Sequence, residues 1–329
     1  MKKAALTLIA LALTLVLVAS ACVSQVDLVV FHAGSLTVPF DRVAEEFEEQ
    51  NPGVTIVTEA AGSRTTIRKV TEFGKPCDVV GSADYTVIEE LMFPQYADWY
   101  ISFATNEIVI AYREGAPFAD EIESGKRTWY DVLLHEEVVY GHSDPDADPC
   151  GYRTLMVVQL AEKHYSVPGL YDGLIHGQGM DKGRHNSGRE VVKPKETDLL
   201  YLLESGDLDY AFEYRSVAHQ HGFDFVELPD EIDLSSIDFA DFYATAEVEV
   251  TGKEPGTTAT QTGAPIVYGV TIPSNAPHSE LAIDFLELML GPKGQEILEN
   301  CGQPPIVPAI ASDPMKLPEE LKEFVLSPF

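Results

Sequence analysis

The chain alternates between short apolar runs and stretches in which apolar residues recur every three or four positions. Residues 28–31 and 54–58 are runs typical of buried parallel strands, and residues 38–49 between them have the spacing of an amphipathic helix. The same alternation predicts helix 65–73, strand 78–80, strand 138–141, helix 152–164 and helix 197–203, the last ended by Gly206. Strands that alternate with helices predict an α/β fold with parallel sheets.

Two stretches lack this alternation. Residues 173–188 are rich in glycine and charge, and residues 249–263 are rich in threonine, glycine and glutamate. We expect both to be surface loops of the second half of the fold. The glycines at 177, 179 and 183 do not form a dinucleotide-binding motif, because their spacing is one residue too long and no predicted strand leads into them.

The first 21 residues have the order of a secretory signal peptide. Lys2 and Lys3 precede an apolar stretch over residues 4–18, and three small residues then lead into Cys22. The stretch is shorter than the roughly 20 apolar residues that a membrane span needs. Small residues before a cysteine resemble a lipoprotein signal, in which a lipid on Cys22 anchors the protein to the outer face of the cell membrane. Secretion without a lipid is the alternative.

Composition and charge narrow the class of partner. The 329 residues include 45% hydrophobic positions, which excludes wholesale disorder. The chain has 22 Lys and Arg but 53 Asp and Glu, which gives a formal net charge of −31. Such a charge repels the phosphate backbone of nucleic acids, so we expect no nucleic-acid partner. Adaptation to a salty medium accounts for such an acid surplus, because salt screens self-repulsion.

The cysteines beyond Cys22 show no pattern of their own. Cys77, Cys150 and Cys301 match no CxxC metal site and cannot all pair, so we expect no disulfide.

Two Gly-Ser turns follow the first two predicted strands. Ser35 and Ser63 each stand just before an apolar-periodic helix, as capping residues do. A helix start offers free backbone N–H groups and partial positive charge, so it can hold an anion without lysine or arginine. Parallel strands bring both turns to one edge of the sheet, where ligands of open α/β folds bind. A third turn at residues 82–85 is weaker, because Asp84 would repel an anion and is expected only to cap a helix.

The chain also carries phrases of a known family. They are FHAGSL (31–36), EAAGSRTTIRKV (59–70), DVVGSADYTVIEELM (78–92), ATNEIVIAYR (104–113), DPCGYR (148–153), SGDLDYAFEYRSVAHQHG (205–222), PIVYGVTIP (265–273) and KGQEILENCGQPPIVP (293–308). These phrases, spread over nearly the whole mature chain, resemble archaeal-type molybdate/tungstate-binding proteins of ABC importers. The resemblance implies an extracytoplasmic, monomeric binding protein that uses no cofactor, is not an enzyme, and delivers molybdate or tungstate to an ABC permease and its ATPase subunit.

The fold that the resemblance implies is the α/β type II periplasmic-binding-protein fold. Two α/β lobes are joined by two hinge crossings, with the ligand cleft between them. Residues 106–112 and 265–273 suit the crossings, because each is a strand-like run between breaks. Lobe one would combine residues 22–108 and 268–329, and lobe two would be residues 109–267.

The resemblance also assigns ligand-binding residues. Ser35 and Ser63 would bind the oxygens of the oxyanion, and Asp148 and Glu213 would approach the metal centre itself, with Asp146 as the alternative to Asp148. Cys150 would contribute its backbone N–H at a helix start rather than a nucleophilic thiol. Tyr214 would either donate its hydroxyl to the ligand or pack between the lobes.

Carboxylates beside an anion require a positive atom to bind. Hexavalent molybdenum or tungsten can expand from four oxygen ligands to six and accept a carboxylate oxygen, whereas the sulfur of sulfate cannot.

Two alternative functions remain: a binding protein for sulfate, thiosulfate or phosphate, and a hydrolase that uses Asp148 and Glu213 as acid and base. His32 with Ser35 lacks the pattern of a hydrolase, and His219 with His221 lacks further zinc ligands.

Overall fold

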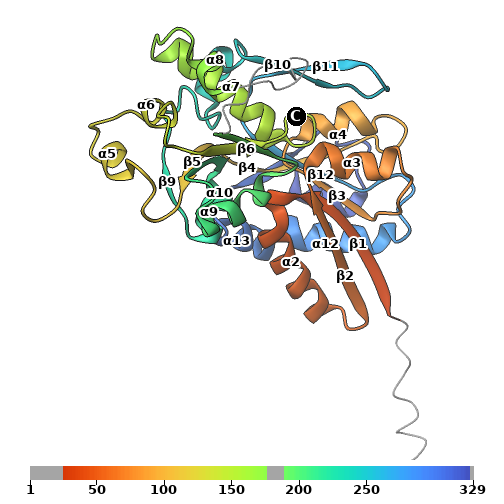
Figure 1. Cartoon of the computed structure of the whole chain (residues 1–329). Helices are drawn as coiled ribbons and strands as arrows, with labels where there is room; N and C mark the ends of the chain where they lie inside the picture. Colours follow the sequence, from red (N-terminus) through yellow and green to blue (C-terminus); the bar gives the residue numbers. More distant parts are fainter. Residues whose placement is uncertain (1–24, 176–188, 327–329) are drawn as a thin grey trace, which may run out of the picture.

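The computed structural model describes residues 25–175 and 189–326, which form two large β-sheets with helices around them and one two-stranded sheet (Figure 1). The expected signal peptide and Cys22 lie outside the described residues, as does most of segment 173–188. Within the described ranges, no helix is both long and apolar enough to cross a membrane.

The first sheet has six strands in the order β13-β4-β12-β3-β1-β2. Strands β2, β1 and β3 are parallel, whereas β12, β4 and β13 pair antiparallel. Its strands are β1 (Val26–Ala33), β2 (Val54–Ala61), β3 (Val79–Ser82), β4 (Ile101–Thr105), β12 (Val267–Thr271) and β13 (Pro305–Ala311). Its helices are η1 (Gly34–Leu36), α2 (Thr37–Gln50), α3 (Ser63–Thr71), α4 (Tyr85–Met92), α12 (Ser279–Leu290), α13 (Pro292–Asn300) and η5 (Glu319–Phe324). We call this sheet and its helices the first lobe.

The second sheet has five strands in the order β7-β6-β8-β5-β9. Its strands are β5 (Ile108–Tyr112), β6 (Tyr140–Ser143), β7 (Glu190–Lys193), β8 (Tyr210–Tyr214) and β9 (Asp224–Val226). The helices around it are α5 (Ala119–Glu123), α6 (Trp129–Leu133), α7 (Pro149–His164), α8 (Leu170–Leu174), η3 (Glu196–Asp198), α9 (Leu200–Ser205), α10 (Arg215–His221), η4 (Ile237–Phe239) and α11 (Ala240–Tyr243). We call this sheet and its helices the second lobe.

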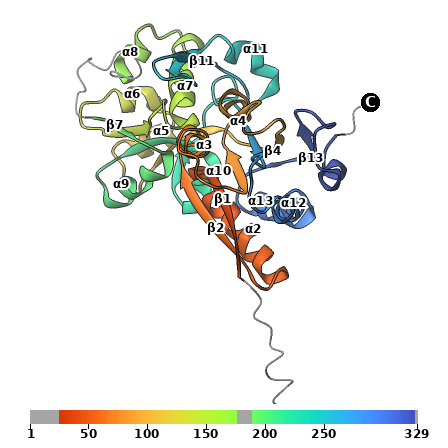
Figure 2. The same cartoon turned by 90° about the vertical axis from the view of Figure 1, so that its right-hand side faces the viewer.

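Segments from both ends of the chain meet in the first lobe, and the middle of the chain forms the second (Figures 1 and 2). In the first lobe, Phe285 of α12 packs edge-on against Phe40 and Phe47 of α2, with ring centroids 6.3 and 5.6 Å apart. All three side chains are buried. This aromatic contact ties the last third of the chain to the first helix, so the lobe is built from segments that are remote in sequence.

The strands and helices expected from the alternation are present, with ends shifted by a few residues. Gly206 ends α9 in a left-handed conformation, with φ 79°, as expected for a glycine at a helix C-terminus.

The two strands expected to cross between the lobes are wrong in detail. β5 pairs only within the second sheet and β12 only within the first. The outward crossing is therefore the short link Asn106–Glu107, because the ladder pairs of β4 and β5 commit each strand to one sheet.

The stretch 249–263, expected to be a loop, is mostly a β-hairpin of β10 (Glu247–Thr251) and β11 (Thr258–Thr262). Val248 and Val250 are buried and alternate with exposed residues, a period-two pattern outweighed in the sequence by the polar composition. The hairpin is held to the second lobe where Gln159 of α7 exchanges two hydrogen bonds with the backbone of Glu247.

The other end of the hairpin contacts the first lobe and lies over α3 and α4 (Figure 1). Arg64 and Arg68 of α3 donate to the carbonyls of Thr251 and Gly252, the Arg68 Nη2 to Gly252 O distance being 2.7 Å. Gln261, which pairs with Val248 nearer the open end of the hairpin, also contacts the first lobe by donating to Glu90 of α4 at 2.9 Å. The β10–β11 hairpin thus bridges the two lobes, and we call it the clasp.

We predict that Arg68→Met loosens this clasp. The variant loses the hydrogen bonds to the hairpin, worth about 1 kcal/mol, so trypsin should cut after Lys253 at the hairpin end roughly fivefold faster. Limited proteolysis with mass spectrometry measures this rate. Arg127→Met is the matched control, because Arg127 pairs with Glu121 within the second lobe. Equal cleavage rates in the two variants would contradict the clasp.

Candidate functional site

The two Gly-Ser turns lie side by side at the ends of β1 and β2, and both serines are buried. Their expected capping role is wrong. The extended residues before the two helical segments are Ala33 and Gly62, so each serine already lies inside a helical turn and neither side chain caps it. The Ser35 hydroxyl instead accepts from the Tyr268 hydroxyl, and the Ser63 hydroxyl accepts from the Ala83 N–H, both at 2.9 Å.

Asp148 stands opposite these turns, at the start of α7. It is buried and caps the helix: Oδ1 accepts from the N–H of Cys150 at 3.3 Å, and Oδ2 accepts from the N–H of Glu196 at 2.9 Å. Asp146, the alternative ligand, is turned to the hairpin, where it accepts from Thr251 N and Oγ1 at 2.7 and 2.9 Å. The structure therefore places Asp148 rather than Asp146 between the lobes.

Glu213 lies in β8 and is fully buried. Its Oε1 accepts from the N–H of Tyr214 at 2.9 Å, but no donor of the described residues reaches Oε2. A buried carboxylate oxygen without a donor is destabilising unless a proton or a positive ligand atom satisfies it.

Glu196 is a third buried carboxyl, which the sequence analysis missed. It lies in the turn after β7, and no donor of the described residues reaches either carboxyl oxygen. A Cβ atom placed on Gly34 would lie 2.7 Å from Glu196 Oε1, so this carboxyl packs directly on the first Gly-Ser turn. The sequence did contain a signal for Glu196. If the strand at residues 190–193 had been recognised, the rule that turns after parallel strands lie at one sheet edge would have placed Glu196 near the lobe junction.

The three carboxyls act on each other. Burial raises the pKa of Asp148, and it raises the pKa values of Glu196 and Glu213 well above their usual range, with the charge of Asp148 adding to the effect on both. Within residues 25–175 and 189–326, no three His, Cys, Asp or Glu side chains are arranged to hold a metal ion. The carboxyls therefore do not form a cage for a bare cation.

A second close approach joins the turns of the two lobes. A Cβ on Gly62 would lie 2.4 Å from Ala147 O and 2.8 Å from Asp148 Cβ, so only glycine fits there. The N–H of Thr65 donates to Ala147 O at 3.3 Å. The helix start of α3 and the helix start of α7 are thus in direct contact.

Arg153 of α7, also missed from the sequence, contributes the buried positive charge at this junction. Its Nη2 pairs with Asp84 Oδ2 at 3.0 Å, and its Nη1 donates to Ala83 O at 2.7 Å and to the Tyr214 hydroxyl at 2.8 Å. Asp84 caps α4 as expected, through Thr86 N at 2.9 Å, and in addition neutralises Arg153. Tyr214 also packs on Tyr268 with ring centroids 5.8 Å apart, so it contacts the first lobe.

The sequence-predicted residues therefore converge. Neighbouring contacts link Ser35, Ser63, Asp148, Cys150, Glu213 and Tyr214 at the junction of the lobes. Burial and the nearby carboxylates raise the pKa of the Cys150 thiol well above its usual range, which is the opposite of what a nucleophile needs. Cys77, Cys150 and Cys301 are free thiols.

His32 does not act as a base toward Ser35. Its Nδ1 donates to Ala33 O at 2.7 Å, while the Ser35 hydroxyl is bonded to Tyr268. Burial lowers the pKa of His32 from 6.5 to about 4, so the ring is neutral at pH 7. His219 and His221 lie in the last turn of α10.

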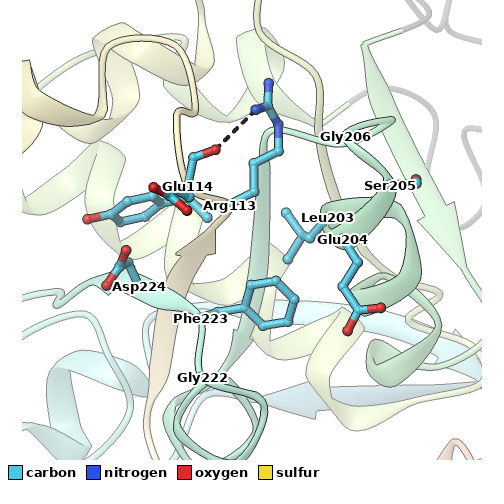
Figure 3. A pocket seen from close by; sticks show the side chains of 10 residues that line it. Arg113, Glu114, Leu203, Glu204, Ser205, Gly206, Gly222, Phe223 and Asp224 are labelled. Atoms are coloured by element: carbon cyan, nitrogen blue, oxygen red, sulfur yellow. Dashed lines mark hydrogen bonds between the residues drawn. The ribbon is translucent and has the colours of Figure 1, made fainter.

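A surface hollow of about 600 Å³ on the second lobe is a poor alternative site for an anion (Figure 3). Its one arginine, Arg113, donates to Glu114 O at 3.3 Å and pairs with Asp209 at 2.9 Å. The acids Glu204 and Asp224 line the same hollow. The junction of the lobes is therefore the candidate site.

Comparisons with known sequences point to one family. The sequence model described as bacterial extracellular solute-binding protein matches residues 28–302. An uncharacterized solute-binding protein of Petrotoga mobilis is 53% identical over 91% of this chain and 90% of its own. The molybdate/tungstate-binding proteins WtpA of Pyrococcus abyssi and Thermococcus kodakarensis are 43% and 41% identical, over 91% and 92% of this chain and 89% and 88% of theirs.

Solved structures show the same fold. The periplasmic molybdate-binding protein of Azotobacter vinelandii matches with a TM-score of 0.54 at 18% identity, over 84% of this chain and 98% of its own. The sulfate-binding protein SubI of Mycobacterium tuberculosis matches with a TM-score of 0.57 at 14% identity, over 86% of this chain and 88% of its own. The expected α/β fold of two-lobed periplasmic binding proteins is confirmed.

The lowered pKa of His32 predicts a pH dependence of stability. The unfolded chain takes up a proton on this ring below about pH 6.5, and the folded chain does so only near pH 4, so the contribution is complete above pH 6.5 and is lost as the pH falls toward 4. Between pH 7 and pH 4 the wild type should lose about 3 kcal/mol more free energy of unfolding than His32→Asn. Denaturant titrations measure the difference, with the exposed His164→Asn as control. Parallel profiles of wild type and His32→Asn would show that the ring is not neutral in the fold.

Proposed function

The chain belongs to the family of bacterial extracellular solute-binding proteins, and from this membership we propose that it captures molybdate or tungstate outside the cytoplasm for an ABC importer. The observation that carries the proposal is the buried Oε2 of Glu213, which has no donor among the described residues although it lies at the junction of the lobes. The names of the relatives from Pyrococcus abyssi and Thermococcus kodakarensis support the same ligand.

Neutral groups would hold the oxygens of the ligand. Ser35 and Ser63 present hydroxyls at the starts of η1 and α3, where the first backbone N–H groups have no partner within their own helix. The N–H of Cys150 at the start of α7, which donates to Asp148 in the present structure, is the third backbone donor that we propose. Tyr214 adds a hydroxyl from the second lobe. Helix starts favour an anion through their partial positive charge.

The carboxylates of Asp148 and Glu213 would bind the central atom. A hexavalent molybdenum or tungsten accepts hard oxygen ligands beyond its four oxo groups, so each carboxylate gains a positive partner and the raised pKa is relieved. Sulfate and phosphate offer no such atom and would be repelled. This arrangement would favour molybdate and tungstate, whose metal centre the carboxylates can coordinate, over anions that the carboxylates only repel.

The remaining features belong to the same proposal. A signal peptide over residues 1–21 would export the chain, and a lipid on Cys22 would anchor it to the outer face of the membrane, as a monomer that meets a permease driven by an ATPase subunit. Lobe one would comprise residues 22–108 and 268–329, and lobe two residues 109–267. The donor set fits an oxyanion cargo without a cofactor, and the neutral His32 and the raised pKa of the Cys150 thiol favour binding over catalysis.

A panel of oxyanions tests the proposed ligand. Tungstate and molybdate at micromolar concentration should raise the melting temperature, because a ligand that binds only the folded state stabilises it by RT ln(1 + [L]/Kd). Sulfate and phosphate at a hundredfold excess should not. Equal stabilisation by all four would rule out coordination by carboxylates, and chemical conversion of a substrate would identify a hydrolase instead.

Glu213→Gln tests the carboxylate itself. The amide keeps the shape but is a weaker ligand for the metal centre, so the ratio of tungstate to sulfate affinity should fall by about tenfold or more. Competition calorimetry measures this ratio. Glu190→Gln is the matched control, because Glu190 is a buried glutamate of the same lobe that contacts His142 at 3.0 Å. An unchanged ratio in Glu213→Gln would remove Glu213 from the ligand set.

A further inference from the structure

Two hydroxyls at the junction, those of Ser63 and Tyr214, accept hydrogen bonds from groups of the protein that can only donate. A hydroxyl has one proton to donate, and which way it points depends on what its oxygen accepts. Ser63 Oγ accepts from the backbone N–H of Ala83 at 2.9 Å, and the Tyr214 hydroxyl accepts from Arg153 Nη1 at 2.8 Å. A backbone N–H and a guanidinium can only donate, so both hydroxyls keep their own protons for another partner.

For Ser35 the direction depends on two further residues. Ser35 Oγ is 2.9 Å from the Tyr268 hydroxyl, and a bond between two hydroxyls can run either way. The Tyr268 hydroxyl also lies 3.1 Å from Nδ2 of Asn106. If the Asn106 amide donates to the Tyr268 hydroxyl, the Tyr268 proton is left with Ser35 Oγ as its acceptor among the described residues.

The orientation of the Asn106 amide is set by backbone groups. Its Oδ1 accepts from the N–H groups of Glu107 at 3.0 Å and Ser216 at 3.4 Å, and neither of these groups can accept. The opposite end, Nδ2, therefore faces Tyr268 and Ser216 Oγ as a donor, the latter at 2.8 Å. Asn106, Tyr268 and Ser35 are all buried, so water does not compete for these bonds.

We propose that Asn106 and Tyr268 are positioning residues whose chain of hydrogen bonds makes Ser35 a donor to the bound oxyanion. Asn106 donates to Tyr268, Tyr268 donates to Ser35, and the Ser35 proton is left for the ligand. This inference rests on the proposed function and deepens it, because it explains how neutral side chains at the junction present protons to the oxygens of the ligand. Asn106 lies in the link between the lobes, so the same residue that joins the two sheets also sets the polarity of the site.

Asn106→Asp reverses the chain with almost no change of shape. The new carboxylate accepts the Tyr268 proton, Tyr268 then accepts the Ser35 proton, and Ser35 turns its lone pairs toward the ligand. We expect tungstate affinity to fall about a hundredfold at pH 8, because a charge-assisted hydrogen bond is replaced by repulsion.

The new negative charge also repels the ligand directly, so Asn106→Asp is measured in wild type and in two further backgrounds, Tyr268→Phe and Ser35→Ala. In Tyr268→Phe the chain is already broken, and Asn106→Asp should then lower affinity less than tenfold. The same smaller loss is expected in Ser35→Ala. A role of Asn106 in folding alone would give equal losses in all three backgrounds, and that result overturns the proposal. Circular dichroism and melting temperature verify that each variant is folded.

The outcome separates this inference from the proposed ligand. If wild-type protein binds tungstate and the losses are equal, the chain of hydrogen bonds is wrong while the proposed function stands. If wild-type protein binds sulfate rather than tungstate or molybdate, the proposed ligand is wrong, and the same comparison made with sulfate still decides the role of Asn106. Failure to bind any of the oxyanions overturns both.

Discussion

The site depends on buried carboxyl oxygens that accept no hydrogen bond from the described residues. Glu196 and Glu213 are fully buried, and the oxygens of Asp148 accept from the backbone N–H groups of Cys150 and Glu196. Such groups destabilise a fold that leaves them empty, and natural sites accept that loss where it serves binding. These carboxyls therefore fit the proposed ligand, which brings both a positive centre and acceptor oxygens.

The junction holds two lobes together by contacts of different kinds. Gly62 lets the backbone of α3 reach Ala147, Arg153 of the second lobe pairs with Asp84 of the first, and the β10–β11 hairpin binds Arg64 and Arg68 at its far end. The contacts between the lobes are thus distributed over several elements around the junction.

The positive charge in this junction is internal to the fold. Arg153 is surrounded by Asp84, Ala83 O and the Tyr214 hydroxyl, so its charge is neutralised before a ligand arrives. Because Arg153 donates to the Tyr214 hydroxyl, the Tyr214 proton is left for another partner. In the proposed site, oriented hydroxyls would hold the oxygens of the ligand, and the carboxylates of Asp148 and Glu213 would select for its metal centre.

The sequence by itself determined the alternation of strands and helices, the two Gly-Ser turns and the phrases around Asp148 and Glu213, because these are local patterns or matches along the chain. Only the tertiary structure decided the rest. The short strand β7 before Glu196 was not recognised in the sequence, and the polar composition of the β10–β11 hairpin outweighed its period-two pattern. Ser35 contacts Tyr268 across a separation of 233 residues. Hydrogen bonds between such distant residues leave no trace in local spacing, since the packing of the sheets creates them.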